Sequence, residues 1–158
     1  NNLQGKTQDL LTFDTEDLVE ELYLEQCGHH RSFFAVAAYM TLKAQVLYLY
    51  GYFDDAAQSL DRAKELSIYV ETCIPETDIN VYESLVLLAR YSAAPKKQGK
   101  KIFEQVSANQ KKLKTWADNC PANFLHKYLL VEAEMAGVKG KTAEAMKLYE
   151  QALEAAKS

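Results

Sequence analysis

Apolar residues recur at steps of three and four along most of the chain, which is the spacing of amphipathic α-helices. No segment alternates apolar and polar residues in the manner of a half-buried strand leading into a hairpin turn. The pattern predicts an all-α fold of about seven helices. We expect the first five near residues 14–26, 31–50, 53–72, 78–91 and 96–118, and the last two between Pro121 and Lys157, on either side of a turn at Gly140.

End signals set the bounds of the first predicted helix. Asp14 opens a run of polar and acidic residues that suits a helix N-terminus, and Gly28 suits a helix C-terminus. Leu18, Leu22 and Tyr23 share one face of this helix, and we expect that face to point inward.

Small residues recur at matched distances from Gly51 and Gly140. Alanine stands seven residues before, five after and twelve after each glycine: Ala44, Ala56 and Ala63 around the first, and Ala133, Ala145 and Ala152 around the second. Packed helices lie only about 8–10 Å apart, so a larger side chain at a crossing would separate them. Leu60 and Tyr149, nine residues after each glycine, are bulky enough to fill the next groove. The register predicts two antiparallel helical hairpins.

This register resembles the tetratricopeptide repeat, a helix–turn–helix unit of about 34 residues. Stacked hairpins preceded by one extra helix would form a right-handed α-solenoid, a single repeat-like domain over residues 1–158. The match is degenerate. Gly51 and Gly140 lie 89 residues apart, which requires a longer hairpin between them, and Ala136 stands where the repeat usually has tyrosine.

Composition and charge narrow the class of protein. Hydrophobic residues make up 48% and charged residues 25%, as in ordinary globular domains, and the net charge of −4 argues against a nucleic-acid partner. No apolar run is long enough for a membrane span, and the polar start resembles no signal peptide. The odd number of well-separated cysteines favours a reducing, cytoplasmic setting. Since no initiator Met is present, we expect a fragment of a longer multidomain protein.

Three stretches resemble one particular family of proteins that contain helical repeats. Residues 47–56, 108–113 and 116–136 are similar to the helical-repeat region of large bacterial and fungal signalling multikinases. Members of that family join a serine/threonine kinase-like domain, an ATPase domain, helical repeats, a GAF sensor and often a histidine kinase. The resemblance implies a non-catalytic module that binds proteins and connects and regulates catalytic domains, with no cofactor and no metal.

The repeat register also predicts a partner-binding surface, because the first helix of each hairpin lines the concave groove. The predicted groove residues are Thr41, Gln45, Tyr48, Lys127, Leu130 and Glu134. Two interpretations stay open. A peptide of a protein partner binds there, or a following helix or a neighbouring domain fills the groove.

Two alternatives compete with the scaffold hypothesis. The terminal helix, Lys141–Lys157, could pair across a two-fold axis and make the chain a homodimerisation module. A small nucleotide-binding or phosphotransfer domain would use Lys141, Thr142 or His126. Gly137–Thr142 ends like a phosphate-binding loop, but Met135 replaces a required glycine and the preceding segment reads as a helix. A hairpin turn explains the same residues.

Two further clusters have ordinary explanations. Cys27, His29 and His30 are crowded into four residues, which suits a turn between helices better than a tetrahedral metal site. The fifth helix is rich in lysine, at positions Lys96, Lys97, Lys100, Lys101, Lys111, Lys112 and Lys114. An acidic partner could dock on that face. We favour a solvated face with intrahelical pairs such as Glu104 with Lys100.

Overall fold

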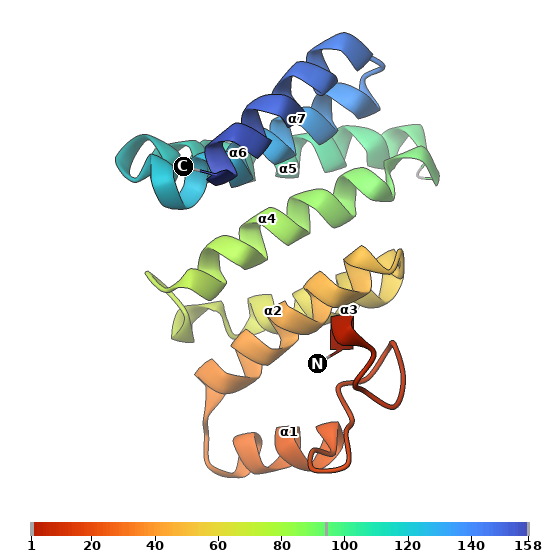
Figure 1. Ribbon diagram of the computed structural model, residues 1–158, viewed down its shortest axis with the longest axis vertical. Coiled ribbons are helices and arrows are strands. Elements are labelled where there is room, and N and C mark those ends of the chain that lie inside the picture. The colour runs from red at the N-terminus through yellow and green to blue at the C-terminus, as the bar shows by residue number, and fades with distance from the viewer. Residues whose placement is uncertain (1, 94, 158) are drawn as a thin grey trace. The chain divides into compact units, whose positions relative to one another are not determined.

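The structure, a computed structural model, describes residues 2–93 and 95–157. Within those ranges it contains seven α-helices and no strand, which confirms the predicted fold class and helix number (Figure 1). The helices are α1 (Glu20–His29), α2 (Phe33–Leu49), α3 (Phe53–Glu65), α4 (Ile74–Ala89), α5 (Lys96–Asn119), α6 (Pro121–Val138) and α7 (Thr142–Lys157). Three short 3₁₀ turns are η1 (Asn2–Gln4), η2 (Ser67–Tyr69) and η3 (Tyr91–Ala93).

The chain divides into two compact units, Asn1–Tyr82 and Glu83–Ser158, and the boundary falls within α4. The right-handed stacking of all the hairpins, and a single domain spanning the chain, remain predictions.

The α2–α3 hairpin of the first unit forms as the alanine register predicts. Gly51 adopts φ +82°, a left-handed conformation in which a side chain would be strained. The amide of Tyr52 donates to the carbonyl of Leu47 at 2.9 Å, which closes the helix end as in a Schellman motif. Ala44, Ala56 and Ala63 are completely buried. Small side chains therefore occupy the places where α2 and α3 come closest.

The α6–α7 hairpin of the second unit repeats this arrangement around Gly140. Its φ is +75°, and the amide of Lys141 donates to the carbonyl of Ala136 at 3.0 Å. The three alanines that the register singles out are buried: Ala133, Ala145 and Ala152. The prediction of a tight helical hairpin at Gly140 is confirmed.

The first helix differs from its predicted bounds. It begins at Glu20 rather than near Asp14, because the Asp14 carboxylate accepts the Glu20 amide at 2.7 Å from outside the helix. The Thr15 hydroxyl accepts the amide of Leu18 at 3.1 Å, a local bond that competes with helix formation. The expected end at Gly28 is also wrong, since α1 continues to His29. The predicted inward face was wrong at Leu22, which is exposed.

The third helix ends earlier than its hydrophobic pattern indicates. It stops at Glu65, and η2 follows. This break brings Val70 into a buried cluster with Ala37, Ala63 and Ile79. Pro75 lies in the first turn of α4, where its missing amide hydrogen costs no helical bond.

Buried amides tie α5 to its neighbours within the second unit. The Asn109 amide group donates to Ser84 Oγ at 3.1 Å and to Glu83 Oε2 at 2.8 Å, both on α4. The neighbouring Gln110 donates to Glu132 Oε1 on α6 at 2.7 Å. Since a sliding helix would leave these buried groups unpaired, they fix the register of α5.

Candidate interaction surface

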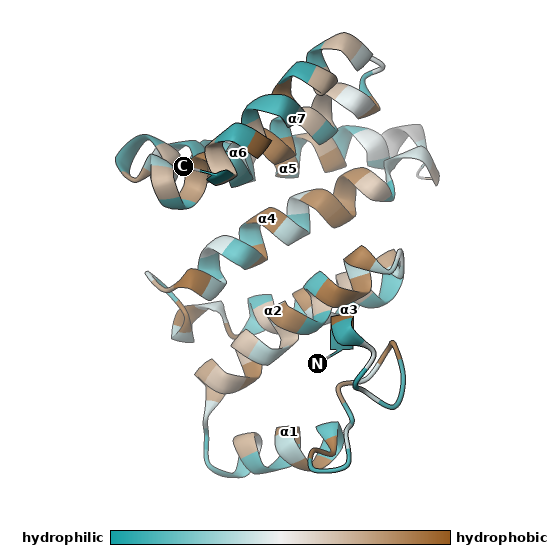
Figure 2. Cartoon of the chain, viewed as in Figure 1, coloured by the Kyte–Doolittle hydropathy of each residue, from teal (hydrophilic) through white to brown (hydrophobic). Residues whose placement is uncertain are grey.

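One face of α2 presents large apolar side chains to the surface. Phe34, Leu42 and Leu49 are 49%, 54% and 54% exposed, and helical geometry places all three within about a quarter of the helix circumference. Gln45 lies between them on the same face. We call these four residues the α2 stripe. Figure 2 shows that apolar residues continue along most of α2.

An open pocket of about 730 Å³ adjoins the α2 stripe. Leu42, Gln45 and Val46 form its α2 wall. The other wall comes from the segment that precedes α1, residues 2–18, which we call the strap. Its lining residues are Asn2, Leu3, Gln4, Thr7, Phe13, Thr15, Asp17 and Leu18. In Figure 1 the strap is the red segment that begins at η1 and leads into α1.

Asn2 closes the first part of the strap into a loop. Its side chain is buried, and its amide group donates to Thr7 Oγ1 at 3.1 Å and to the carbonyl of Thr12 at 3.0 Å. The hydroxyl of Tyr50, at the end of α2, donates to the carbonyl of Asn2 at 3.4 Å. This long bond attaches the loop to the helix.

Glu20 attaches the second part of the strap. One carboxylate oxygen accepts the amide of Phe13 at 3.1 Å, and the other pairs with Lys43 on α2. The Phe13 ring meets the Tyr39 ring edge to face, with centroids 5.3 Å apart. Such aromatic pairs add about 0.5–1.5 kcal/mol beyond their area burial. Phe13 is therefore the main apolar anchor of the strap on α2.

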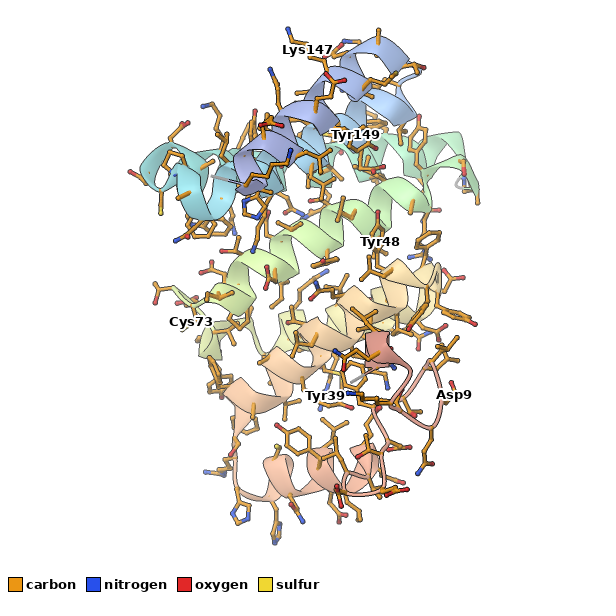
Figure 3. All side chains as sticks on the ribbon, viewed as in Figure 1. Asp9, Tyr39, Tyr48, Cys73, Lys147 and Tyr149 are labelled. Carbon is orange, nitrogen blue, oxygen red and sulfur yellow. The ribbon has the colours of Figure 1, made fainter. Side chains whose placement is uncertain are left out.

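Tyr39 lies on the side of α2 that the strap and α1 cover (Figure 3). Its ring also packs against Tyr23 of α1 at 5.4 Å. Burial, and then the neighbouring Glu20 carboxylate, raise the pKa of the Tyr39 phenol well above its usual value. The phenol therefore stays neutral over the physiological range.

The predicted groove residues of the first unit share one face of α2 but differ in how exposed they are. Thr41 is 3% exposed, and its hydroxyl donates to the carbonyl of Ala37 at 2.7 Å. The ring of Tyr48 packs near Phe53 and Tyr82. Gln45 alone belongs to the α2 stripe and lines the pocket. A docked peptide would reach Gln45 but not Thr41 in this conformation.

Sequence reasoning missed Phe34, Leu42 and Leu49. Their signal was present, because α2 is apolar around nearly its whole circumference. Such a helix needs partners on every side. The repeat register instead selected Thr41 and Tyr48 as groove residues. Each of them comes one position before a stripe residue, Leu42 or Leu49.

The predicted groove residues of the second unit, Lys127, Leu130 and Glu134, are half-buried on α6. Glu134 accepts a hydrogen bond from Tyr149 of α7 at 2.6 Å, so its carboxylate serves the hairpin. The same hairpin has a shallow open groove of about 710 Å³. Its lining residues are Leu125, Leu129, Lys147, Glu150, Gln151, Glu154 and Ala155.

The Gly137–Thr142 segment is the turn between α6 and α7, with a helix before it rather than a strand. Lys141 pairs with Glu144 at 2.9 Å, and Thr142 is the first residue of α7. His126 is half-buried on α6. In a P-loop, by contrast, the backbone amides that bind phosphate lie on a loop between a strand and a helix.

The cysteine–histidine cluster and the lysine-rich helix also take ordinary positions. Cys27 is buried while His29 and His30 are exposed, and no three metal-ligand side chains among the described residues are grouped to hold an ion. Lys100 pairs with Glu104 at 3.8 Å, as expected for a solvated face. The side chains of Lys96 and Lys97 lie outside the described residues.

Comparison with known proteins gives no relative: no family model, curated protein or solved structure matches the chain. The resemblance to tetratricopeptide repeats and to signalling multikinases remains a hypothesis from the sequence. Among the helices described, none is both long enough and apolar enough to cross a bilayer.

Proposed function

We propose that this chain is a non-catalytic protein-interaction module that binds an extended, apolar segment of a protein partner along α2. The observation that carries the proposal is the exposure of Phe34, Leu42 and Leu49 on one helix face beside an open pocket. Exposed large apolar side chains grouped on one helix face are typical of binding sites on monomeric domains. A non-helical occupant is favoured because the strap, which is irregular after η1 and carries apolar side chains, already lines the same pocket.

The resemblance to multikinase repeat regions supports a setting for this activity. In that setting the module connects catalytic domains of a cytoplasmic signalling kinase, and the bound segment belongs to a neighbouring domain or to a second protein. The net charge of −4 fits a protein partner better than a nucleic acid.

A random-peptide display library panned against the whole chain tests the proposal. The expected result is an enriched set of peptides with spaced apolar residues. Their affinity should fall at least about tenfold in Leu42→Asp and Leu49→Asp chains, because a buried charge opposes apolar contact. Leu153→Asp is the matched control, since Leu153 is 62% exposed on α7 and does not line the pocket beside α2. Peptides that bind all variants equally would refute the proposed surface.

A second function, homodimerisation, is favoured by the outer face of α7. Met146 and Leu153 lie seven residues apart on one helix face and are both largely exposed. An isologous contact through α7 would cover them. Sedimentation equilibrium would then give a mass that rises with concentration, and Leu153→Asp would restore the monomer. A concentration-independent monomer mass rules this function out.

A further inference from the structure

The strap is attached to α2 near its two ends, and its middle bonds to other strap residues rather than to α2. One end is attached to α2 by the Tyr50 hydroxyl, and the other by Phe13 and the Glu20–Lys43 pair. Between these anchors the Asn2 amide group donates to Thr7 Oγ1 and to the carbonyl of Thr12, while Leu10 and Leu11 are exposed. Only a few contacts therefore attach the residues of the strap to α2.

The strap also leaves the space beside α2 unfilled. An open pocket of about 730 Å³ lies between the strap and Leu42 on α2. Leu3 and Leu42 line this pocket from opposite walls and are both largely exposed. A segment that belonged to the permanent core would bury these two side chains against each other.

The contacts of the strap resemble those of a bound peptide. Phe13 places an aromatic side chain against Tyr39, and its backbone amide is held by the Glu20 carboxylate. A side-chain anchor combined with a main-chain hydrogen bond is the general mode in which domains recognise extended segments.

We propose that the strap is a displaceable intramolecular ligand of α2, and that it exchanges with a partner's extended segment whose aromatic side chain takes the place of Phe13. This inference rests on the proposed binding function of the α2 stripe. The covalent link gives the strap an effective concentration in the millimolar range, so its Phe13 occupies the Tyr39 contact beside the α2 stripe until a stronger segment competes. Affinity for a partner is then reduced by the fraction of molecules in which the strap is bound.

The test uses a labelled synthetic peptide of residues 2–18, titrated by fluorescence anisotropy into the full chain. In the Phe13→Ala chain the tethered strap is weakened, so the wild-type peptide should bind at least about tenfold more tightly than it binds the wild-type chain. A peptide that itself carries Phe13→Ala should bind neither chain. Leu10→Ala is the matched control, because Leu10 is an exposed strap residue that does not line the pocket. That chain should behave as wild type.

A folded Phe13→Ala chain that gains no affinity for the peptide would overturn the proposal. If this variant loses its cooperative melting transition, amide hydrogen exchange on the wild-type chain decides instead. Strap amides that exchange at least about tenfold faster than those of α2 support displacement. If the strap amides exchange as slowly as those of α2, the strap is a permanent part of the fold.

The two proposals fail separately. Library peptides that depend on Leu42, together with a strap peptide that never binds, leave the α2 site standing and remove the strap as its ligand. If the strap peptide binds the Phe13→Ala chain but library peptides bind the Leu42→Asp chain as well as wild type, the strap remains a ligand of α2. The proposed binding function of the α2 stripe is then refuted.

Discussion

The hydroxyl of Tyr149 donates a 2.6 Å hydrogen bond to the carboxylate of Glu134 across the α6–α7 hairpin. Both groups are half-buried, and the bond joins the bulky residue of the alanine register to the helix that it packs against (Figure 3). The Tyr149 ring fills the groove between the two helices. Its hydroxyl gives the half-buried Glu134 carboxylate a hydrogen bond in place of the water that packing removes.

Removal of that hydroxyl should weaken the hairpin. We expect Tyr149→Phe to lower the free energy of unfolding by about 1–2 kcal/mol, since bonds to charged acceptors exceed the average hydrogen bond. Urea denaturation measures the change. Tyr52→Phe is the control, because Tyr52 is exposed. Equal stabilities for the two variants would contradict a role for the bond.

Two glycines three residues apart should respond oppositely to alanine. Gly140 has φ +75°, where a side chain is strained, so Gly140→Ala should cost about 1–2 kcal/mol. Gly137 lies within α6, and a Cβ there would meet nothing within 4 Å. Gly137→Ala should therefore gain about 0.5 kcal/mol from helix propensity. Thermal melting of both variants checks the pair, and a loss at Gly137 would show that its space is not free.

Neighbouring leucines on α2 separate core from surface. Leu47 is almost completely buried, and Leu47→Ala should cost about 2–5 kcal/mol of stability by leaving a cavity. Leu49 belongs to the exposed α2 stripe, so Leu49→Ala should change stability by no more than about 0.5 kcal/mol. Denaturation midpoints provide the comparison. A large loss at Leu49 would mean that the stripe is covered within the folded chain.

The Tyr39 phenol should make the fold sensitive to alkali. Its pKa in the folded chain is raised by burial and by Glu20, while the unfolded phenol ionises near pH 10, at a pKa of about 10. Its contribution to stability is complete below that pH and is lost above it, because only the unfolded state releases the proton readily. The loss is at most about 1.4 kcal/mol for each pH unit.

Urea denaturation between pH 9 and about pH 11 measures this slope. The Tyr39→Phe chain should have a shallower slope than wild type. Some dependence should remain, since burial also raises the pKa values of Tyr82 and Tyr128. An unchanged slope in Tyr39→Phe would show that Tyr39 ionises equally well in both states.

The features that the sequence predicted correctly depend on local geometry. The two hairpins follow from a glycine with positive φ and from alanines at close crossings, both of which are visible as residue types at fixed spacing. The start of α1 was not predictable from propensity, because the Asp14 and Thr15 side chains bond nearby amides instead of extending the helix. The end of α3 depends on where Val70 must pack.

The α2 stripe and the strap illustrate a different limit. Helical periodicity gives the relative positions of residues around α2, but it does not show which side the rest of the chain leaves uncovered. The strap has no period at all. Its position depends on single anchors, Asn2, Phe13 and Glu20, whose partners are distant in sequence.

The most direct test of the α2 surface is a methyl NMR titration of the leucine-labelled full chain with a peptide enriched from the library. Binding along α2 predicts that the methyl resonances of Leu42 and Leu49 shift together and saturate, while those of Leu125 and Leu129 in the α6–α7 groove stay in place. Shifts confined to Leu125 and Leu129, with Leu42 and Leu49 unmoved, would contradict the account.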